Sequence, residues 1–209
     1  IANKNNAFIV PGNGLPDKYF SSEISNNKNF KFIMVSRILR DKGVIEYLSA
    51  AQKITHEFPD CEFELFGAFD ENNPQSIKKS EIERYLTPNI RFKGFEKNIK
   101  HRILQSNVLV LPSYREGFAR VLMEAQACSR PVITSNISGC KDVIVENETG
   151  FLINPMDVDD LVTKIKYFIQ NSESYFEMSQ NSFHHAKNNF QIKQAADNHE
   201  EIFNKILYR

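Results

Sequence analysis

Two glutamates at a fixed spacing are the residues of this 209-residue sequence that most clearly suggest chemistry. Glu116 lies in a polar stretch, and Glu124 follows eight residues later in a stretch with helical periodicity. If both were helical, they would lie roughly 80° and 12 Å apart. The two carboxylates could not then act on one atom, but they could contact the two ends of an elongated ligand. We therefore expect Glu116 at the reactive end and Glu124 deeper, where it could accept hydrogen bonds from the vicinal hydroxyl groups of a sugar.

Each glutamate also has an ordinary structural interpretation. Glu116 could be a first-turn glutamate that the helix dipole favours. Glu124 could be a solvated residue on the polar face of a helix. For either residue alone, the spacing does not decide between these interpretations and a binding site.

Two cations, Arg37 and Lys42, follow another apolar run. At the carboxyl end of a buried strand and beside a helix start, they would meet a diphosphate and supply charge as a leaving group becomes more negative. The ordinary interpretation is a solvated turn in which they pair with Asp41 and Glu46.

The segment from 107 to 135 must position the glutamates. An apolar, β-branched run at 108–111 predicts a strand that is buried on both faces, and Pro112 ends it. From Phe118 onwards, apolar residues recur at offsets 3, 4, 7 and 10, as in an amphipathic helix, before a second β-branched run at 132–134. In a unit of strand, loop, helix and strand, the free amides at the helix start point toward the ligand site. This arrangement suits a phosphate.

The rest of the chain alternates between strand-like and helix-like patterns. This alternation predicts one α/β domain with a parallel sheet of about six strands, helices on both faces and a helical C-terminal appendage. We expect a mobile polar loop at 21–29 and a long polar excursion at 68–74. Further strands are predicted at 32–35, 62–66, 90–92 and 151–153, and further helices at 45–58, 98–105, 157–169, 173–189 and 192–206.

Composition narrows the classes of function. Lys plus Arg and Asp plus Glu number 26 each, so no net charge favours a nucleic-acid partner and any anion site must be local. The three cysteines show no metal-ligand spacing and are expected to be reduced thiols in a cytosolic protein. No apolar run approaches the roughly 18 residues that a membrane-spanning helix needs, and no signal peptide opens the chain. The chain begins with Ile1 instead of Met, which suggests a fragment of a longer polypeptide.

Several common sites are absent from the sequence. The five histidines do not assemble a metal site, because His184 and His185 are adjacent and lack a carboxylate at metal-ligand spacing. The sequence also lacks the Gly-x-Gly-x-x-Gly, Walker and Gly-x-Ser-x-Gly motifs. We therefore do not expect a dinucleotide oxidoreductase, a P-loop nucleotidase or an α/β-hydrolase.

The combined pattern resembles the group 1 family of retaining glycosyltransferases, whose signature is Glu-x7-Glu. The resemblance covers essentially the whole chain, and it implies a GT-B enzyme in which two Rossmann-like domains face a cleft. This chain is similar to the C-terminal domain, which binds the nucleotide sugar. The matching residues are Glu116-Gly117-Phe118, Glu124-Ala125, Ala127-Cys128, Pro131-Val132-Ile133, Gly139, Glu146-Asn147 and Thr149-Gly150-Phe151-Leu152.

The resemblance also implies roles for individual residues. Glu116, Arg37 and Lys42 carry the catalytic roles, and charge from the two cations makes a bound metal or other cofactor unnecessary. The Asn13-Gly14 pair resembles the segment by which the chain enters the second domain, with a glycine close to the donor phosphates. The residues expected to bind the nucleotide sugar are Gly14, Phe95 (largely through its backbone), Gly117, Phe118, Ala119, Arg120, Val121 and Glu124.

The resemblance implies three parts: an interdomain segment (1–30), a nucleotide-sugar-binding domain (31–170) and C-terminal helices (171–209) that pack toward a missing N-terminal acceptor domain. The expected enzyme is a UDP-dependent hexosyl or N-acetylhexosaminyl transferase of polysaccharide biosynthesis. It would be cytoplasmic or peripheral at the inner face of the cell membrane, with any membrane contact made through the missing half. A nucleotide-sugar epimerase and a non-catalytic carbohydrate-sensing module remain as alternatives.

Overall fold

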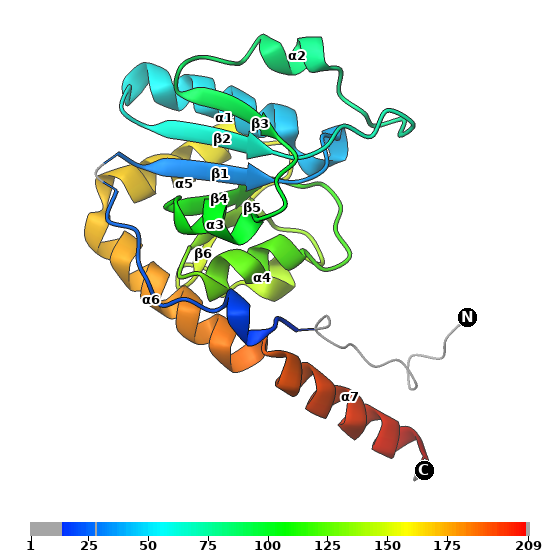
Figure 1. Cartoon of the computed structure of the whole chain (residues 1–209). Helices are drawn as coiled ribbons and strands as arrows, with labels where there is room; N and C mark the ends of the chain where they lie inside the picture. Colours follow the sequence, from blue (N-terminus) through cyan, green and yellow to red (C-terminus); the bar gives the residue numbers. More distant parts are fainter. Residues whose placement is uncertain (1–13, 28, 208–209) are drawn as a thin grey trace.

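The computed structural model describes residues 14–27 and 29–207. A six-stranded parallel sheet with the order β3-β2-β1-β4-β5-β6 forms its centre (Figure 1), which confirms the predicted Rossmann-like α/β class. The strand order reverses between β1 and β4, and ligands of such sheets bind at the carboxyl ends of the strands beside this reversal. The strands are β1 (Lys31–Val35), β2 (Glu62–Phe66), β3 (Ile90–Gly94), β4 (Val108–Leu111), β5 (Val132–Ser135) and β6 (Gly150–Ile153).

Helices cover both faces of the sheet. On one face α1 packs against α5, and on the other α4 packs against β4 and β5 with α3 beside it. The short α2 lies outside the expected elements. The helices are α1 (Val44–Glu57), α2 (Lys79–Glu83), α3 (Ile99–Leu104), α4 (Arg120–Ala127), α5 (Val158–Gln170), α6 (Ser172–Asn189) and α7 (Ile192–Leu207), with 3-10 helices η2 (Asp17–Tyr19), η3 (Arg40–Lys42) and η4 (Lys141–Val143).

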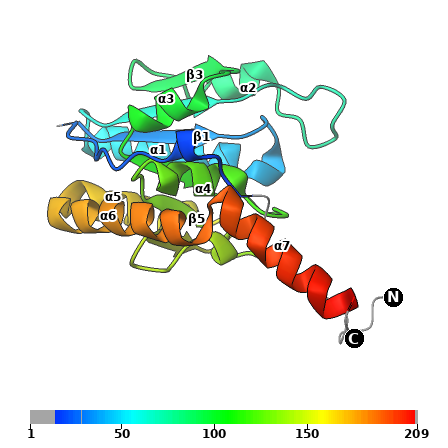
Figure 2. The ribbon, with the colours of Figure 1, turned by 60° about the horizontal axis from the view of Figure 1, so that its bottom comes forward.

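The two last helices behave differently. α6 packs along α4 and buries Tyr175 and Met178, whereas α7 projects away from the body in Figures 1 and 2. On α7 the side chains of Ile192 and Phe203 are 53% and 62% exposed. The helical appendage is therefore present, while its packing toward another domain stays a prediction.

Residues 21–25 are held against the body, contrary to the expectation of a mobile loop over 21–29. The Ser21 amide donates to the Ala127 carbonyl at 2.8 Å, and Ser129 Oγ donates to the Ser21 carbonyl at 2.8 Å. Tyr175 Oη adds a bond to the Ser25 carbonyl at 3.3 Å. These contacts use main-chain atoms of the segment, so its polar side chains did not reveal them.

Arg130 is a fully buried cation that joins three parts of the fold. Desolvation by burial lowers the pKa of its guanidinium. Helix C-terminal carbonyls carry partial negative charge, which compensates the guanidinium without a carboxylate. It donates to the carbonyls of Ile103, Leu104 and Ser106 at the end of α3, Cys128 and Ser129 at the end of α4, and Glu23.

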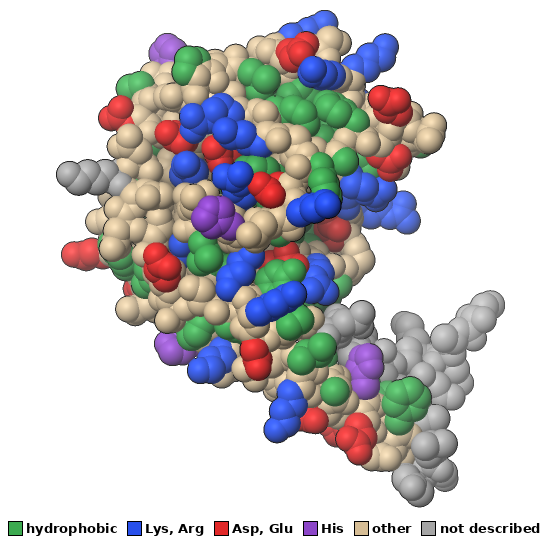
Figure 3. All heavy atoms as spheres, viewed as in Figure 1, with side chains coloured by type: hydrophobic (Ala, Val, Ile, Leu, Met, Phe, Trp, Pro, Cys, Tyr) green, Lys and Arg blue, Asp and Glu red, His purple; other side chains and the backbone are tan. Residues whose placement is uncertain are grey.

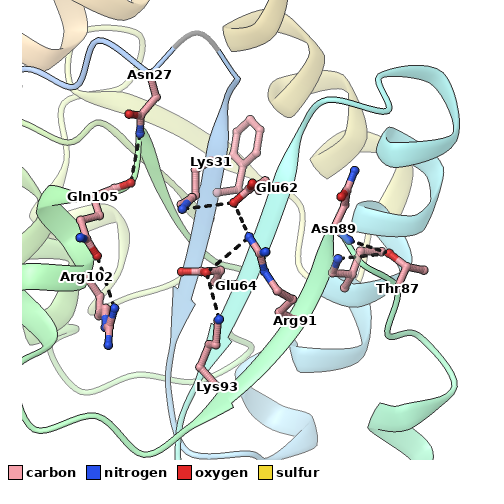
Figure 4. A network of polar contacts seen from close by, with 12 residues as sticks. Asn27, Lys31, Glu62, Glu64, Thr87, Asn89, Arg91, Lys93, Arg102 and Gln105 are labelled. Carbon is pink, nitrogen blue, oxygen red and sulfur yellow. Dashed lines mark hydrogen bonds and ion pairs between the residues drawn. The ribbon is translucent and has the colours of Figure 1, made fainter.

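The outer half of the sheet carries a ladder of charges on the face shown in Figure 4. Glu62 pairs with Lys31 at 3.1 Å and with Arg91, and Glu64 pairs with Arg91 at 3.7 Å and Lys93 at 3.6 Å. Because side chains alternate between the faces of a strand, the apolar neighbours of these residues point into the core on the other face. The ladder keeps this part of the sheet polar.

Candidate functional site

The loop between β4 and α4 carries Glu116 at the carboxyl end of the sheet. The helix begins at Arg120, later than the start near Gly117 that the sequence predicts, because Ala119 has non-helical backbone angles (φ −76°, ψ 84°). Within the described residues, the amides of Gly117 and Phe118 donate no hydrogen bond to the protein. They are therefore available to an anionic ligand at this helix start.

Lys42 and Glu116, both predicted to be catalytic, form one ion pair. Lys42 Nζ lies 2.8 Å from Glu116 Oε1, and the two side chains are only 13% and 15% exposed. Lys42 Nζ also donates to the Arg115 carbonyl at 3.2 Å. The ordinary interpretation, a solvated turn in which Lys42 pairs with Asp41 or Glu46, is not what the structure shows.

Close contact between the loops after β1 and β4 makes this ion pair possible. The Tyr114 amide and Ser113 Oγ donate to the Asp41 carbonyl at 2.7 and 3.0 Å. Gly43 has a φ of +72°, and a Cβ atom at this position would lie 2.0 Å from the Pro112 carbonyl oxygen. Only glycine therefore fits here, and the two loops meet across the neighbouring strands β1 and β4.

Glu124 is buried in α4 instead of solvated on its polar face, as its ordinary interpretation required. Arg120 Nε lies 2.9 Å from Glu124 Oε1. Burial raises the pKa of the Glu124 carboxyl, and the hydrogen bond and charge of Arg120 oppose this rise. Glu124 and Glu116 thus have different basic partners.

Arg37 and Phe95 follow β1 and β3 at the carboxyl end of the sheet, whereas Gly14 lies beside the start of α7. Arg37 is 59% exposed at its side chain and pairs with Asp70 of the 68–74 excursion at 3.0 Å, so that segment has a contact at the site edge. Phe95 is 71% exposed and does not belong to the core. Gly14 has a φ of +70° and packs on the backbone of Ile192, where a Cβ atom would lie 2.6 Å from Cα. Asn13 lies outside the described residues.

The loop after β5 also reaches the site, a contact to which the sequence analysis gave no role. The Gly139 carbonyl accepts from the Ala119 amide at 3.0 Å, and a Cβ atom on Gly139 would lie 2.4 Å from the Gly117 carbonyl oxygen. Asp142 Oδ2 accepts from the Gly139 amide at 2.9 Å. A glycine five residues after the predicted strand end was the available signal.

The described residues contain no group of three or more His, Cys, Asp or Glu side chains that could hold a metal ion. Burial raises the pKa of each of the thiols of Cys61, Cys128 and Cys140 to about 11, so none is a ready nucleophile near neutral pH. Over the same residues, each helix is too short or too polar to cross a membrane.

A parallel sheet with a basic and an acidic side chain paired at its strand reversal defines the chain as a Rossmann-like domain. Comparison with known proteins identifies the family. Residues 17–185 match the family described as Glycosyl transferases group 1. The chain belongs to this family.

Three similar proteins illustrate the relationship. The capsular polysaccharide biosynthesis glycosyltransferase CapM of Staphylococcus aureus is 30% identical over 202 residues, which cover 96% of this chain and 52% of CapM. Anabaena Alr3699/HepE in complex with UDP matches with a TM-score of 0.81 and 20% identity, covering 92% of this chain and 56% of that one. The C-terminal domain of the group 1 protein LpcC of Francisella tularensis matches with a TM-score of 0.75 and 22% identity, covering 86% of this chain and all of that domain (100%). The chain thus spans about half the length of CapM and has the fold of a solved C-terminal domain.

Proposed function

We propose that this chain is the donor-binding half of a retaining glycosyltransferase that transfers a hexosyl or N-acetylhexosaminyl group from a UDP-sugar to a glycan or lipid-linked acceptor. The ion pair between Lys42 and Glu116 carries the proposal, because it holds a cation and a carboxylate together at the strand reversal. The UDP complex of HepE and the polysaccharide-related name of CapM support the ligand and the product class.

The charges of the site suggest how the donor would be held. Lys42, Arg37 and the free amides of Gly117 and Phe118 would stabilise the negative charge that grows on the departing diphosphate. Glu116 would position the donor sugar and could stabilise its developing positive charge. Glu124, at the other end, would accept hydrogen bonds from the ribose hydroxyls. Positive charge from these protein groups takes the place of a metal ion in this proposal.

Calorimetric titration of UDP, with and without a chelator, tests the proposal. We expect binding in chelator, and Lys42→Ala should weaken it by about 1.5 to 3 kcal/mol, the range for a hydrogen bond to a charged group. Arg37→Ala should cost less, because the Arg37 side chain is 59% exposed and already pairs with Asp70.

Lys53→Ala is the matched control, since Lys53 forms an exposed ion pair with Asp159 between α1 and α5 and should leave the affinity unchanged. UDP binding that vanishes in chelator would contradict the metal-free account. Absence of UDP binding under both conditions would contradict the donor-binding function itself.

A further inference from the structure

A small basic hollow lies between η2 and the start of α3. It has a volume of about 290 Å³ and is lined by Lys18, Tyr19, Lys97, Asn98, Ile99 and Lys100. We call it the lysine pocket. On the face of the molecule that carries α3 and α4, Lys and Arg side chains are interspersed with acidic and apolar ones (Figure 3).

The lysines of the lysine pocket lack an ion-pair partner within the described residues. No acidic residue lines it, and no ion pair involves Lys18, Lys97 or Lys100. Lysines elsewhere, such as Lys53 and Lys166, pair with acids. The chain as a whole has equal numbers of acidic and basic residues, so this local excess is not a consequence of composition. Like charges in one hollow repel one another, and a bound anion would remove that cost.

Two of the three lysines make contacts within the pocket. Lys100 Nζ donates to the Lys18 carbonyl at 2.5 Å, which fixes one ammonium group against η2. Lys18 Nζ lies 6.0 Å from the centre of the Tyr19 ring, and Arg120 Cζ lies 5.8 Å from the same ring. Tyr19, which lines the pocket, therefore also contacts Arg120, a residue predicted to bind the nucleotide sugar.

We propose that the lysine pocket binds a phosphate group other than those of the donor nucleotide. Three ammonium groups without a competing carboxylate suit a phosphate or diphosphate, which offers several charged acceptor oxygens. A hollow of about 290 Å³ accommodates such a group, and Tyr19 and Ile99 add apolar surface at its wall. The existence of this site does not depend on the proposed function. Its role does: beside Arg120, the pocket would hold a phosphate-bearing acceptor, or a lipid headgroup, next to the donor.

Titration of inorganic diphosphate, followed by amide chemical shifts in the presence of saturating UDP, tests the site. UDP occupies the donor site, so shifts confined to residues 17–19 and 97–100 report the pocket. The double variant Lys18→Gln, Lys100→Gln should weaken diphosphate binding at least tenfold and leave UDP affinity within twofold. The control double variant Lys164→Gln, Lys187→Gln should change neither, because these lysines also lie over aromatic rings (Phe151 and Phe183) but away from the pocket.

The inference would be overturned if diphosphate did not shift the amide signals of residues 17–19 and 97–100 in the wild-type protein. It would also be overturned if the double variant Lys18→Gln, Lys100→Gln (the pocket variant) bound diphosphate as tightly as the wild type. Both results differ from the one that would contradict the proposed function, namely that UDP itself does not bind. In that case, diphosphate titrated alone still reports the pocket through the same amides.

Vesicles distinguish the sources of the phosphate. Sedimentation with phosphatidylglycerol vesicles, lost in the pocket variant and absent with phosphatidylcholine, would assign the pocket to a lipid headgroup. Diphosphate binding without vesicle binding would assign it to a phosphate group carried by a soluble compound or by the acceptor. Both results support a phosphate site.

Discussion

The ion pair between Lys42 and Glu116 links two side chains whose predicted roles differ. A diphosphate that binds Lys42 must share the ammonium group with the Glu116 carboxylate, since the two atoms lie 2.8 Å apart. Removing the carboxylate charge would free the ammonium group for the diphosphate. Loss of Glu116 should therefore not weaken the binding of a bare nucleotide.

We predict that Glu124→Gln and Glu116→Gln separate nucleotide binding from sugar binding. Glu124→Gln should weaken the binding of UDP itself by about tenfold, because a charged hydrogen-bond acceptor becomes neutral. Glu116→Gln should spare UDP and weaken only the sugar-bearing donor. Paired calorimetric titrations with UDP and with a panel of UDP-sugars measure this. Equal losses of UDP affinity in both variants would show that the roles are assigned wrongly.

At the residue scale, the sequence singled out candidate site residues but did not show how they pair. Lys42 and Glu116 are 74 residues apart and come from different loops, so no local pattern joins them. For the same reason, Asp70 was not foreseen as the partner of Arg37. The i, i+4 spacing of Arg120 and Glu124, by contrast, was visible in the sequence as a potential helical pair.

At the scale of elements, Gly43 determines how closely the loops after β1 and β4 approach. A side chain there would have to displace Pro112, whose carbonyl oxygen would lie 2.0 Å from the added Cβ. The Lys42 side chain starts one residue earlier and depends on the same approach.

We predict that Gly43→Ala lowers the free energy of unfolding by several kcal/mol. The same change should lower the affinity for UDP. The matched control is Gly94→Ala, because Gly94 has the same φ of +72° but no atom within 4 Å of an added Cβ. Its cost should be limited to backbone strain, about 1 to 2 kcal/mol. Chemical denaturation and UDP titration measure both effects. Equal destabilisation of the two variants would show that the close approach to Pro112 contributes nothing.

Long periodic elements were predictable, and short or weakly patterned ones were not. The apolar runs of β4 and β5 and the stripes of α1 and α5 follow directly from burial of one or both faces. α2 was missed because Ile82 is the one residue that this five-residue helix buries. The start of α4 was placed too early because the contact of Ala119 with the Gly139 loop, a tertiary feature, decides it.

At the scale of the whole molecule, the exposed surface of α7 and the length of the chain relative to CapM both favour a second domain. α7 leaves the body with apolar side chains exposed, and the chain spans about half the length of CapM. We propose that a second domain packs against α7 and forms the other wall of the site. The acceptor would then bind mainly outside the present residues.

We predict that the 209-residue chain binds UDP-sugar but does not transfer the sugar. Transfer requires the acceptor hydroxyl to be held against the anomeric carbon with water excluded, and effective molarities of about 10⁵ M or more are lost when one wall is removed. Residual activity should be slow donor hydrolysis, measured as UDP release. Adding the N-terminal half, fused or in trans, should restore transfer.

Robust transfer by the purified chain alone would refute the half-enzyme interpretation and point to an acceptor site within it, with the 68–74 excursion and the Gly139 loop as the first places to examine. A reconstituted two-domain protein that binds donor without any turnover would instead favour the carbohydrate-sensing alternative.

The six carbonyls around Arg130 also constrain the order in which the chain can fold. The hydrogen bond from Arg130 to the Glu23 carbonyl joins residues 107 positions apart. Residues 21–25 therefore cannot dock until the segment that contains α3, β4 and α4 has been made. Contacts of such long range form slowly, because loop closure must precede them. During synthesis on the ribosome, residues 21–25 would remain undocked while β1, β2 and β3 emerge. Arg130 would bind them only when the second half of the sheet assembles.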